Sequence, residues 1–163
     1  MNMSYKNLAD NTRVWVYQSN RPFSEQEVKS IQEHGVDFIK RWSAHGAKLN
    51  ASFEVFHNLF IALFVDEEQA KATGCSIDKS VHLIKSLEKE FDVKLLDRDG
   101  VAFRDGKSIS VLSRSEFLEK IRSGRLDGDT VVFNNLVSTK KEFETKWEVP
   151  LKESWHYEFI SQS

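Results

Sequence analysis

Residues 51–66, with the sequence Ala51-Ser-Phe-Glu-Val-Phe-His-Asn-Leu-Phe-Ile-Ala-Leu-Phe-Val-Asp66, decide the fold that we expect. They form two apolar, aromatic-rich runs separated by His57 and Asn58. Asparagine tolerates the positive φ of a tight turn, so this pattern predicts a β-hairpin. The second run is apolar without alternation, which is typical of a central strand that is buried on both faces.

A strand and a helix are predicted before this hairpin. Residues 13–18 are a short run rich in β-branched and aromatic residues, which favours a strand. Ser24 and Glu27 form a capping box that begins a helix, and Gly46 is expected to end it. Gly35 lies on the apolar stripe of this helix, where glycine costs about 1 kcal/mol, so it indicates either a close contact or a break.

A second helix and a fourth strand are predicted after the hairpin. Ser76 is the expected N-cap of the helix, whose apolar stripe ends at Phe91, and residues 93–96 are expected to form the strand. The order βαββαβ predicts an α+β fold of the ferredoxin-like, split βαβ type, an antiparallel sheet with two helices on one face. We expect right-handed crossovers that make the first and third strands parallel neighbours.

The pattern changes after residue 98, so we expect a ferredoxin-like domain over residues 1–98 and a small α+β domain or appendage over residues 99–163. Asp105-Gly106 predicts a second hairpin. Ser113 begins a helix that Gly124 ends, and a strand and a short helix capped by Thr139 follow. The chain then ends in an aromatic-rich tail.

Part of this second segment resembles the second class of GYF-type domain. The residues that carry the resemblance are Ser113-Arg-Ser-Glu-Phe-Leu-Glu-Lys-Ile-Arg-Ser-Gly-Arg-Leu-Asp-Gly-Asp-Thr-Val131, followed by Trp147 and Pro150. The chain departs from that pattern by a helix inserted between Val137 and Trp147. GYF domains proper bind proline-rich peptides, so the resemblance implies a binding role.

The predicted topology suggests one ligand site. If both helices begin at the same end of the sheet, residues 18–21 and 74–76 converge, and two helix N-termini point at one place beside Arg21. Unpaired N–H groups and helix dipoles favour an anion there. The residues expected to bind it are Ser19, Asn20, Arg21, Cys75 and Ser76.

Cys75 has two interpretations. Beside a helix N-terminus its thiolate would be stabilised, and it could act as a nucleophile with His45 as base. We favour the alternative of a small buried thiol that fills a helix–sheet corner. No metal site and no cofactor are expected, because the five histidines have no metal-type spacing and the chain has a single cysteine.

Two polar clusters are interpreted as turns. Asp97, Arg98 and Asp99 are expected to form a solvated turn with local ion pairs, which we favour over an anion contact by Arg98. Asn134 and Asn135 are expected to turn the chain after a strand.

Gly106-Lys107-Ser108 resembles the end of a phosphate-binding loop, but the motif does not fit. It requires a glycine where this chain has Val101, and a helix where Ser108 enters a strand. The residues therefore argue against an ATPase.

Six short phrases distributed along the chain are similar to those of an uncharacterised bacterial family of about this length, whose members often carry the label ABC transporter ATPase. They are Trp15-Val-Tyr-Gln-Ser-Asn-Arg21, Trp42-Ser-Ala-His-Gly46, Gly74-Cys-Ser-Ile-Asp78, Val132-Phe-Asn-Asn-Leu136, Trp147-Glu-Val-Pro150 and Ser154-Trp-His156. The family has no established activity, so the resemblance implies none. Because this chain has no phosphate-binding loop, we interpret the label as a mis-transfer.

The composition of the chain excludes several classes of function. The 163 residues carry a formal charge of -2, which excludes a strongly basic nucleic-acid binder. The apolar run at residues 59–65 is too short to span a membrane, and the single cysteine favours a reducing cytoplasm. We expect a non-catalytic binding module; the alternatives are a protein-interaction subunit without a small-molecule site and a Cys75-dependent transferase or hydrolase. A protein partner would dock on the aromatic residues Trp147, Trp155, His156 and Tyr157.

Overall fold

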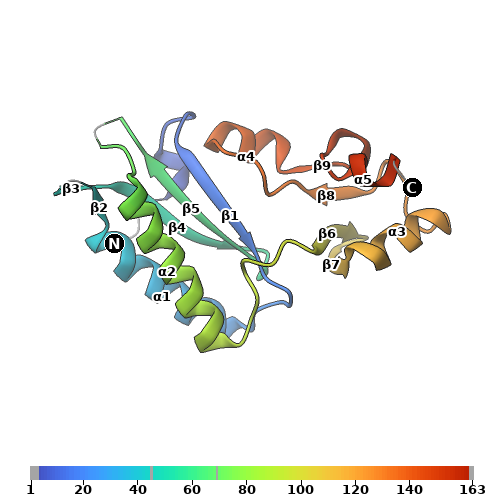
Figure 1. Ribbon diagram of the computed structural model, residues 1–163, viewed down its shortest axis with the longest axis horizontal. Coiled ribbons are helices and arrows are strands. Elements are labelled where there is room, and N and C mark those ends of the chain that lie inside the picture. Colours follow the sequence, from blue (N-terminus) through green and yellow to red (C-terminus); the bar gives the residue numbers. More distant parts are fainter. Residues whose placement is uncertain (1–3, 45, 69, 162–163) are drawn as a thin grey trace.

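The computed structural model describes residues 4–44, 46–68 and 70–161, and shows an α+β protein with two main antiparallel sheets (Figure 1). The first sheet contains β1 (Arg13–Gln18), β4 (Asn50–Phe56) and β5 (Phe60–Asp66) in the order β1-β5-β4. Strand β5 is central, as predicted, and all but its last residue are buried.

The predicted hairpin joins β4 to β5. His57 and Asn58 both have φ of 53°, and the N–H of Leu59 donates to the carbonyl of Phe56. Both central residues are thus left-handed, as a type I′ turn requires.

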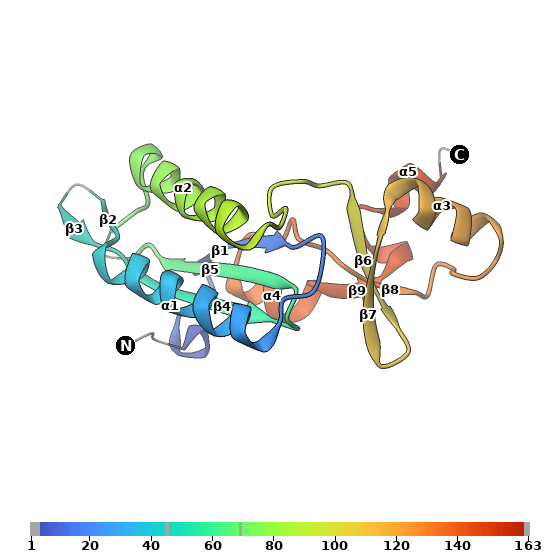
Figure 2. The ribbon, with the colours of Figure 1, turned by 90° about the horizontal axis from the view of Figure 1, so that it is seen from below.

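Helices α1 (Glu25–Arg41) and α2 (Gly74–Phe91) lie side by side on one face of this sheet (Figure 2). The capping box of Ser24 and Glu27 is confirmed. The predicted cap of α2 is wrong by three residues, because Thr73 is the N-cap and Ser76 closes the capping box from the third helical position.

The first helix ends earlier than predicted. It stops at Arg41, and the chain forms a small hairpin from β2 (Ser43–Ala44) and β3 (Ala47–Lys48). Gly46, expected to end the helix, lies in this hairpin with φ of 79°. Trp42 is buried directly after the helix, so its packing stops α1 before the glycine.

Gly35 marks a close contact and no break. A Cβ atom built on Gly35 would overlap the ring of Phe53, a fully buried residue of β4. The helix continues through Gly35 because the absent side chain lets α1 approach the sheet.

Two parts of the ferredoxin-like prediction are wrong. Residues 93–96 form no strand, so this sheet has three strands instead of four. Strands β1 and β5 are neighbours, as predicted, but they pair antiparallel instead of parallel. The parallel pair of the split βαβ unit is β1 and β4, which run in the same direction on either side of β5.

The second half forms its own sheet, in the order β7-β6-β8-β9, with every neighbouring pair antiparallel. The predicted hairpin, the capping box of Ser113 and the helix end at Gly124 (φ 79°) are confirmed. The elements of this half are β6 (Gly100–Asp105), β7 (Ser108–Ser113), α3 (Arg114–Arg122), β8 (Val131–Phe133), α4 (Lys140–Lys146), β9 (Glu148–Pro150), and α5 (Tyr157–Ser161). Two 3₁₀-helices, η1 (Tyr5–Asn7) and η2 (Leu151–Glu153), complete the described structure.

A hydrophobic core joins the two halves across the predicted boundary at residue 98. Phe60 and Phe64 of β5 pack with Phe133, Phe143 and Trp147 of the second half. Helix α4 therefore covers the face of the first sheet opposite to α1 and α2 (Figure 1). Within the described ranges, no helix is both long and apolar enough to cross a membrane.

Replacing Gly35 by alanine tests the close contact of α1 with β4. The new methyl group would meet the ring of Phe53, so we expect Gly35→Ala to destabilise the fold by about 1–3 kcal/mol. Gly74→Ala is the matched control, since nothing lies within 4 Å of its added Cβ, and it should be neutral or slightly stabilising. Urea unfolding of both variants measures the difference, and equal stabilities would contradict the contact.

Candidate functional site

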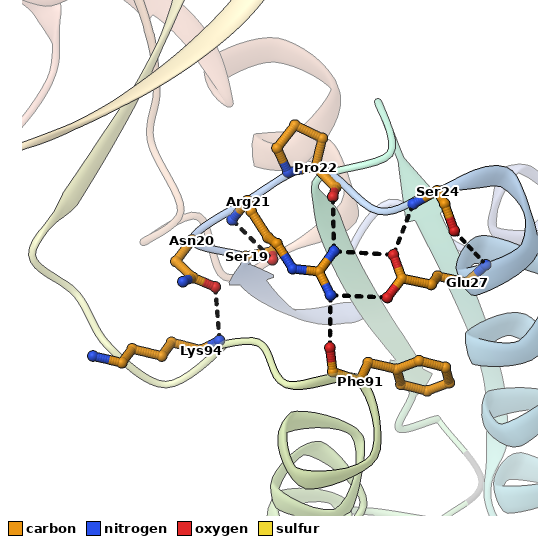
Figure 3. Close-up of polar contacts among 8 residues, drawn as sticks. All are labelled: Ser19, Asn20, Arg21, Pro22, Ser24, Glu27, Phe91 and Lys94. Carbon is orange, nitrogen blue, oxygen red and sulfur yellow. Dashed lines mark hydrogen bonds and ion pairs between the residues drawn. The ribbon is translucent and has the colours of Figure 1, made fainter.

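Arg21 is fully engaged with neighbouring residues (Figure 3). Its guanidinium makes a bidentate ion pair with Glu27, with Nη1–Oε1 at 3.0 Å and Nη2–Oε2 at 2.8 Å. The same nitrogens donate to the carbonyls of Pro22 at 3.1 Å and Phe91 at 2.6 Å. Four bonds from one side chain bind the start of α1 to the end of α2.

This arrangement makes Arg21 a structural brace. Its hydrogen bond, with that of the Ser24 backbone N–H, lowers the pKa of Glu27 to about 2. A cation beside the last carbonyl of α2 also complements the negative end of that helix dipole. The groups that were expected to attract an anion are thus already paired within the protein.

The predicted convergence of two helix N-termini does not occur. Because β1 and β5 are antiparallel, α1 and α2 begin at opposite ends of the sheet. The indole N–H of Trp42, after the end of α1, donates to the carbonyl of Ser76 at 2.8 Å. Cys75 and Ser76 therefore lie beside the end of α1, far from Arg21 along both helices.

Ser19 bonds within its own turn and to the β4–β5 hairpin, whereas Asn20 holds the chain that follows α2. The Ser19 hydroxyl accepts from the backbone N–H of Arg21 at 3.3 Å. Asn20 donates its backbone N–H to the carbonyl of Lys94 and accepts the Lys94 N–H on its side chain (Figure 3). A side-chain oxygen replaces one backbone acceptor here, so the segment at 93–96 is attached to the end of β1 without a strand ladder.

Cys75 is exposed in the first turn of α2, so the prediction of a buried thiol is wrong. His45, the proposed base, lies outside the described residues. His82 is exposed further along α2. The pairing that a cysteine nucleophile needs therefore has no support among the described residues.

The aromatic tail packs back on the body of the protein. Trp147 is buried in the shared core and His156 is only 4% exposed. Trp155 is half-buried and stacks on His156, with ring centroids 4.0 Å apart. Of the four residues expected to meet a partner, Tyr157 is the exposed one, at 46%.

Two adjoining hollows lie where the two halves meet, around the linker that precedes β6. Their volumes are about 220 Å³ and about 450 Å³, and both are lined by Asp97, Asp99 and Gly100. We call these hollows together the junction site. The smaller is also lined by Gln18, Ser19, Asn20, Lys94, Val111, Leu112 and Ser113, and the larger by Arg98, Val101, Arg114, Trp155 and His156.

The junction site carries exposed charges of both signs. Lys94, Arg98 and Arg114 are the cations, and Asp97 and Asp99 are the anions. The turn predicted at residues 97–99 is present, because the N–H of Asp99 donates to the Asp97 carboxylate at 2.9 Å.

The ion pairs predicted for this turn are not formed. Neither Asp97, Arg98 nor Asp99 makes an ion pair within the described chain. The Asp97 carboxylate accepts from the backbone N–H of Asp99 instead of pairing with a cation, and all three side chains line the hollows.

His156 gives the larger hollow an uncharged wall. Burial, and then the nearby charge of Arg114, lower its pKa to about 4, so the imidazole is neutral at pH 7. Its Nδ1 lies 2.6 Å from the Ser154 hydroxyl. The stacked rings of Trp155 and His156 thus form a flat, neutral surface beside Arg114.

Sequence reasoning missed the polar link that builds this junction. The indole N–H of Trp147 donates to the Asn135 side chain, which donates to Gln18 at 2.9 Å. Gln18 in turn donates to the carbonyl of Gly100 at 3.0 Å. Asn135, interpreted as a turn residue, therefore joins the two sheets.

Comparison with protein families, with curated proteins and with solved structures gives no match to this chain. Within the described ranges, no group of His, Cys, Asp and Glu side chains could hold a metal ion.

Removal of the Arg21 brace should weaken the fold in a pH-dependent way. We expect Arg21→Gln to cost about 1 kcal/mol at pH 7, a value that allows for solvent screening of this half-exposed pair. Since Glu27 has a lowered folded pKa, the stabilisation is present above its ordinary value of 4.5 and is lost as pH falls towards 2.

Thermal unfolding of both proteins between pH 7 and pH 2 measures this effect. The difference in melting temperature should shrink as the solution becomes more acidic. Lys29→Gln, an equal charge change on an exposed residue of α1, the helix that contains Glu27, should leave stability nearly unchanged. A difference between Arg21→Gln and wild type that stays constant with pH would contradict the role of Glu27.

Burial of neutral His156 should also make stability depend on pH. The unfolded imidazole takes up a proton near pH 6.5, whereas the folded one does so near pH 4, so acid favours unfolding in that window. The shift corresponds to roughly 3 kcal/mol lost between these pH values. In urea unfolding, His156→Gln should remove this part of the pH dependence. His82→Gln, at an exposed position, should retain it.

Proposed function

We propose that this protein is a non-catalytic binding module whose ligand occupies the junction site. The observation that carries the proposal is that Asp97, Arg98 and Asp99, exposed charges of both signs, line adjoining hollows and make no ion pair within the described part of the chain. Hollows at the meeting of two structural units are common ligand sites in proteins.

The charges favour a small zwitterionic ligand, of the class of free amino acids and short peptides. A carboxylate would lie against Arg98 and Arg114, because guanidinium groups bind planar carboxylates with two hydrogen bonds. An ammonium group would lie against Asp97 and Asp99, which line both hollows. The flat surface of Trp155 suits an apolar or aromatic side chain of the ligand.

The hydroxyl groups around the junction site support a binding role over a catalytic one. The Ser113 hydroxyl accepts from the N–H of Glu116 and contacts its carboxylate at 2.8 Å as the cap of α3. Ser19 accepts from Arg21. His156, the histidine that lines the site, is buried and bonded to Ser154. These hydroxyls and the imidazole are therefore used in holding the site together.

A thermal-shift screen of amino acids and dipeptides tests the proposal. A ligand at a hundredfold excess over its Kd stabilises the folded state by about 2.7 kcal/mol, which is a rise of several degrees for a chain of this size. We expect zwitterions to give this rise. N-acetylated amino acids and amino acid amides, which lack one of the two charges, should give a smaller one.

Arg98→Gln should weaken the binding of the zwitterion by about tenfold or more, the usual cost of losing a charge-assisted hydrogen bond. Arg125→Gln, an equal change at an exposed residue outside the junction site, should bind as wild type does. No shift with any zwitterion, or an equal loss in both variants, would overturn the proposal.

A further inference from the structure

Lys94 is the cation of the junction site to which the proposed function gives no partner. It is exposed and lines the smaller hollow. Its bond to Asn20 uses the backbone N–H, and its side chain extends away from that residue (Figure 3). Within the described part of the chain, the Lys94 ammonium makes no ion pair and no hydrogen bond. A ligand in the smaller hollow would therefore meet a free cation.

The charges of the junction site have an order across the two hollows. Lys94 lines the smaller hollow and Arg98 the larger one, whereas Asp97 and Asp99 line both. The two acids thus belong to the wall that the hollows share, and each hollow adds a cation of its own. The order is cation, acids, cation.

Lys94 and Arg98 are near enough to bind one small molecule. The four residues from one to the other span at most about 14 Å when fully extended. The chain bends at Leu95 and Leu96, which shortens this span. Lysine and arginine have long, flexible side chains, so both charged groups can reach the same ligand.

The acids of the site determine which anions fit beside Lys94. Asp97 and Asp99 also line the smaller hollow, so they would repel a ligand that carries negative charge alone. A ligand that places an ammonium group against these acids removes that repulsion. Glu88 follows a different course, because its carboxylate already accepts the backbone N–H groups of Leu95 and Leu96.

We infer that the ligand of the junction site is an acidic zwitterion, with one ammonium group and two carboxylates. This rests on the proposed function, to which it adds the second carboxylate, bound by Lys94 in the smaller hollow. The ammonium lies against Asp97 and Asp99, and the first carboxylate lies against Arg98. The class comprises aspartate, glutamate and dipeptides that have an acidic side chain.

Pairs of ligands with nearly the same shape test for the second carboxylate. Glutamate is compared with glutamine, and the dipeptide Ala-Glu with Ala-Gln, by thermal-shift titration at low ionic strength. We expect the acidic member of a pair to bind the wild-type chain about threefold or more tightly, as one exposed ion pair allows. Added salt should reduce this preference, because it screens exposed charges. The pair that binds more tightly shows whether a free amino acid or a dipeptide occupies the site.

Glutarate tests the order of the charges. It has the two carboxylates of glutamate and lacks the ammonium group. Because Asp97 and Asp99 would repel it, glutarate should bind at least about threefold more weakly than glutamate.

Three lysine variants locate the second carboxylate. Lys94→Gln removes the cation and keeps the backbone N–H that bonds to Asn20, so it should bring the ratio of glutamate to glutamine affinity close to one. Lys94→Arg keeps the charge and should keep the preference for glutamate. Lys89→Gln is the matched control, an equal charge change on an exposed residue of α2 that lines neither hollow, and should retain the wild-type ratio.

Equal binding within both ligand pairs by the wild-type chain would overturn the inference and leave the proposed function standing. A glutamate preference that persists in Lys94→Gln would mean that the second carboxylate lies elsewhere. Glutarate that binds as tightly as glutamate would mean a site for plain dianions, which also contradicts the inference. No binding by any zwitterion would overturn the proposed function itself, and the inference with it.

Discussion

The two-sided burial of β5 is the constraint on which the rest of the structure depends. Ile61, Leu63 and Val65 face the core beneath α1 and α2, while Phe60 and Phe64 face the second half of the chain. A central strand that is apolar on both faces cannot be left with one face in water. The second half is therefore the cover that this strand requires, and its attachment creates the junction site.

Strand direction determines what Arg21 does. With β1 and β5 antiparallel, the start of α1 lies beside the end of α2, where the nearest backbone groups are carbonyls. A guanidinium placed there satisfies a helix C-terminus, whereas at converging N-termini the same residue would have attracted an anion. The predicted parallel pairing of β1 and β5 therefore made Arg21 look like an anion-binding residue, whereas the antiparallel pairing makes it a structural one.

Motifs of neighbouring residues made much of the fold predictable from the sequence. Features that depend on contacts between distant residues were not predictable in this way. The capping boxes at Ser24 and Ser113 and the turn at Gly106 depend on neighbours a few residues away, and the sequence shows them directly. The absence of a strand at residues 93–96 could not be predicted locally. The segment is held by the side chain of Asn20, which is distant in the sequence and accepts from the backbone N–H of Lys94. The junction site is harder still to predict from the sequence, because Arg98, Arg114 and Trp155 come together only when the two sheets pack.

The same constraint explains why the second sheet keeps an open edge. Covering the aromatic face of β5 uses Ala102 of β6, Phe133 of β8, and α4 with Trp147, and these elements are buried as a result. Strand β7 lies furthest along that sheet, and its Ile109 and Val111 are only partly buried against the shared core. Once β5 is covered, burial of its apolar side chains requires no further element on the outer side of β7. The outward backbone groups of Ile109 and Val111 therefore have no strand partner within the described part of the chain.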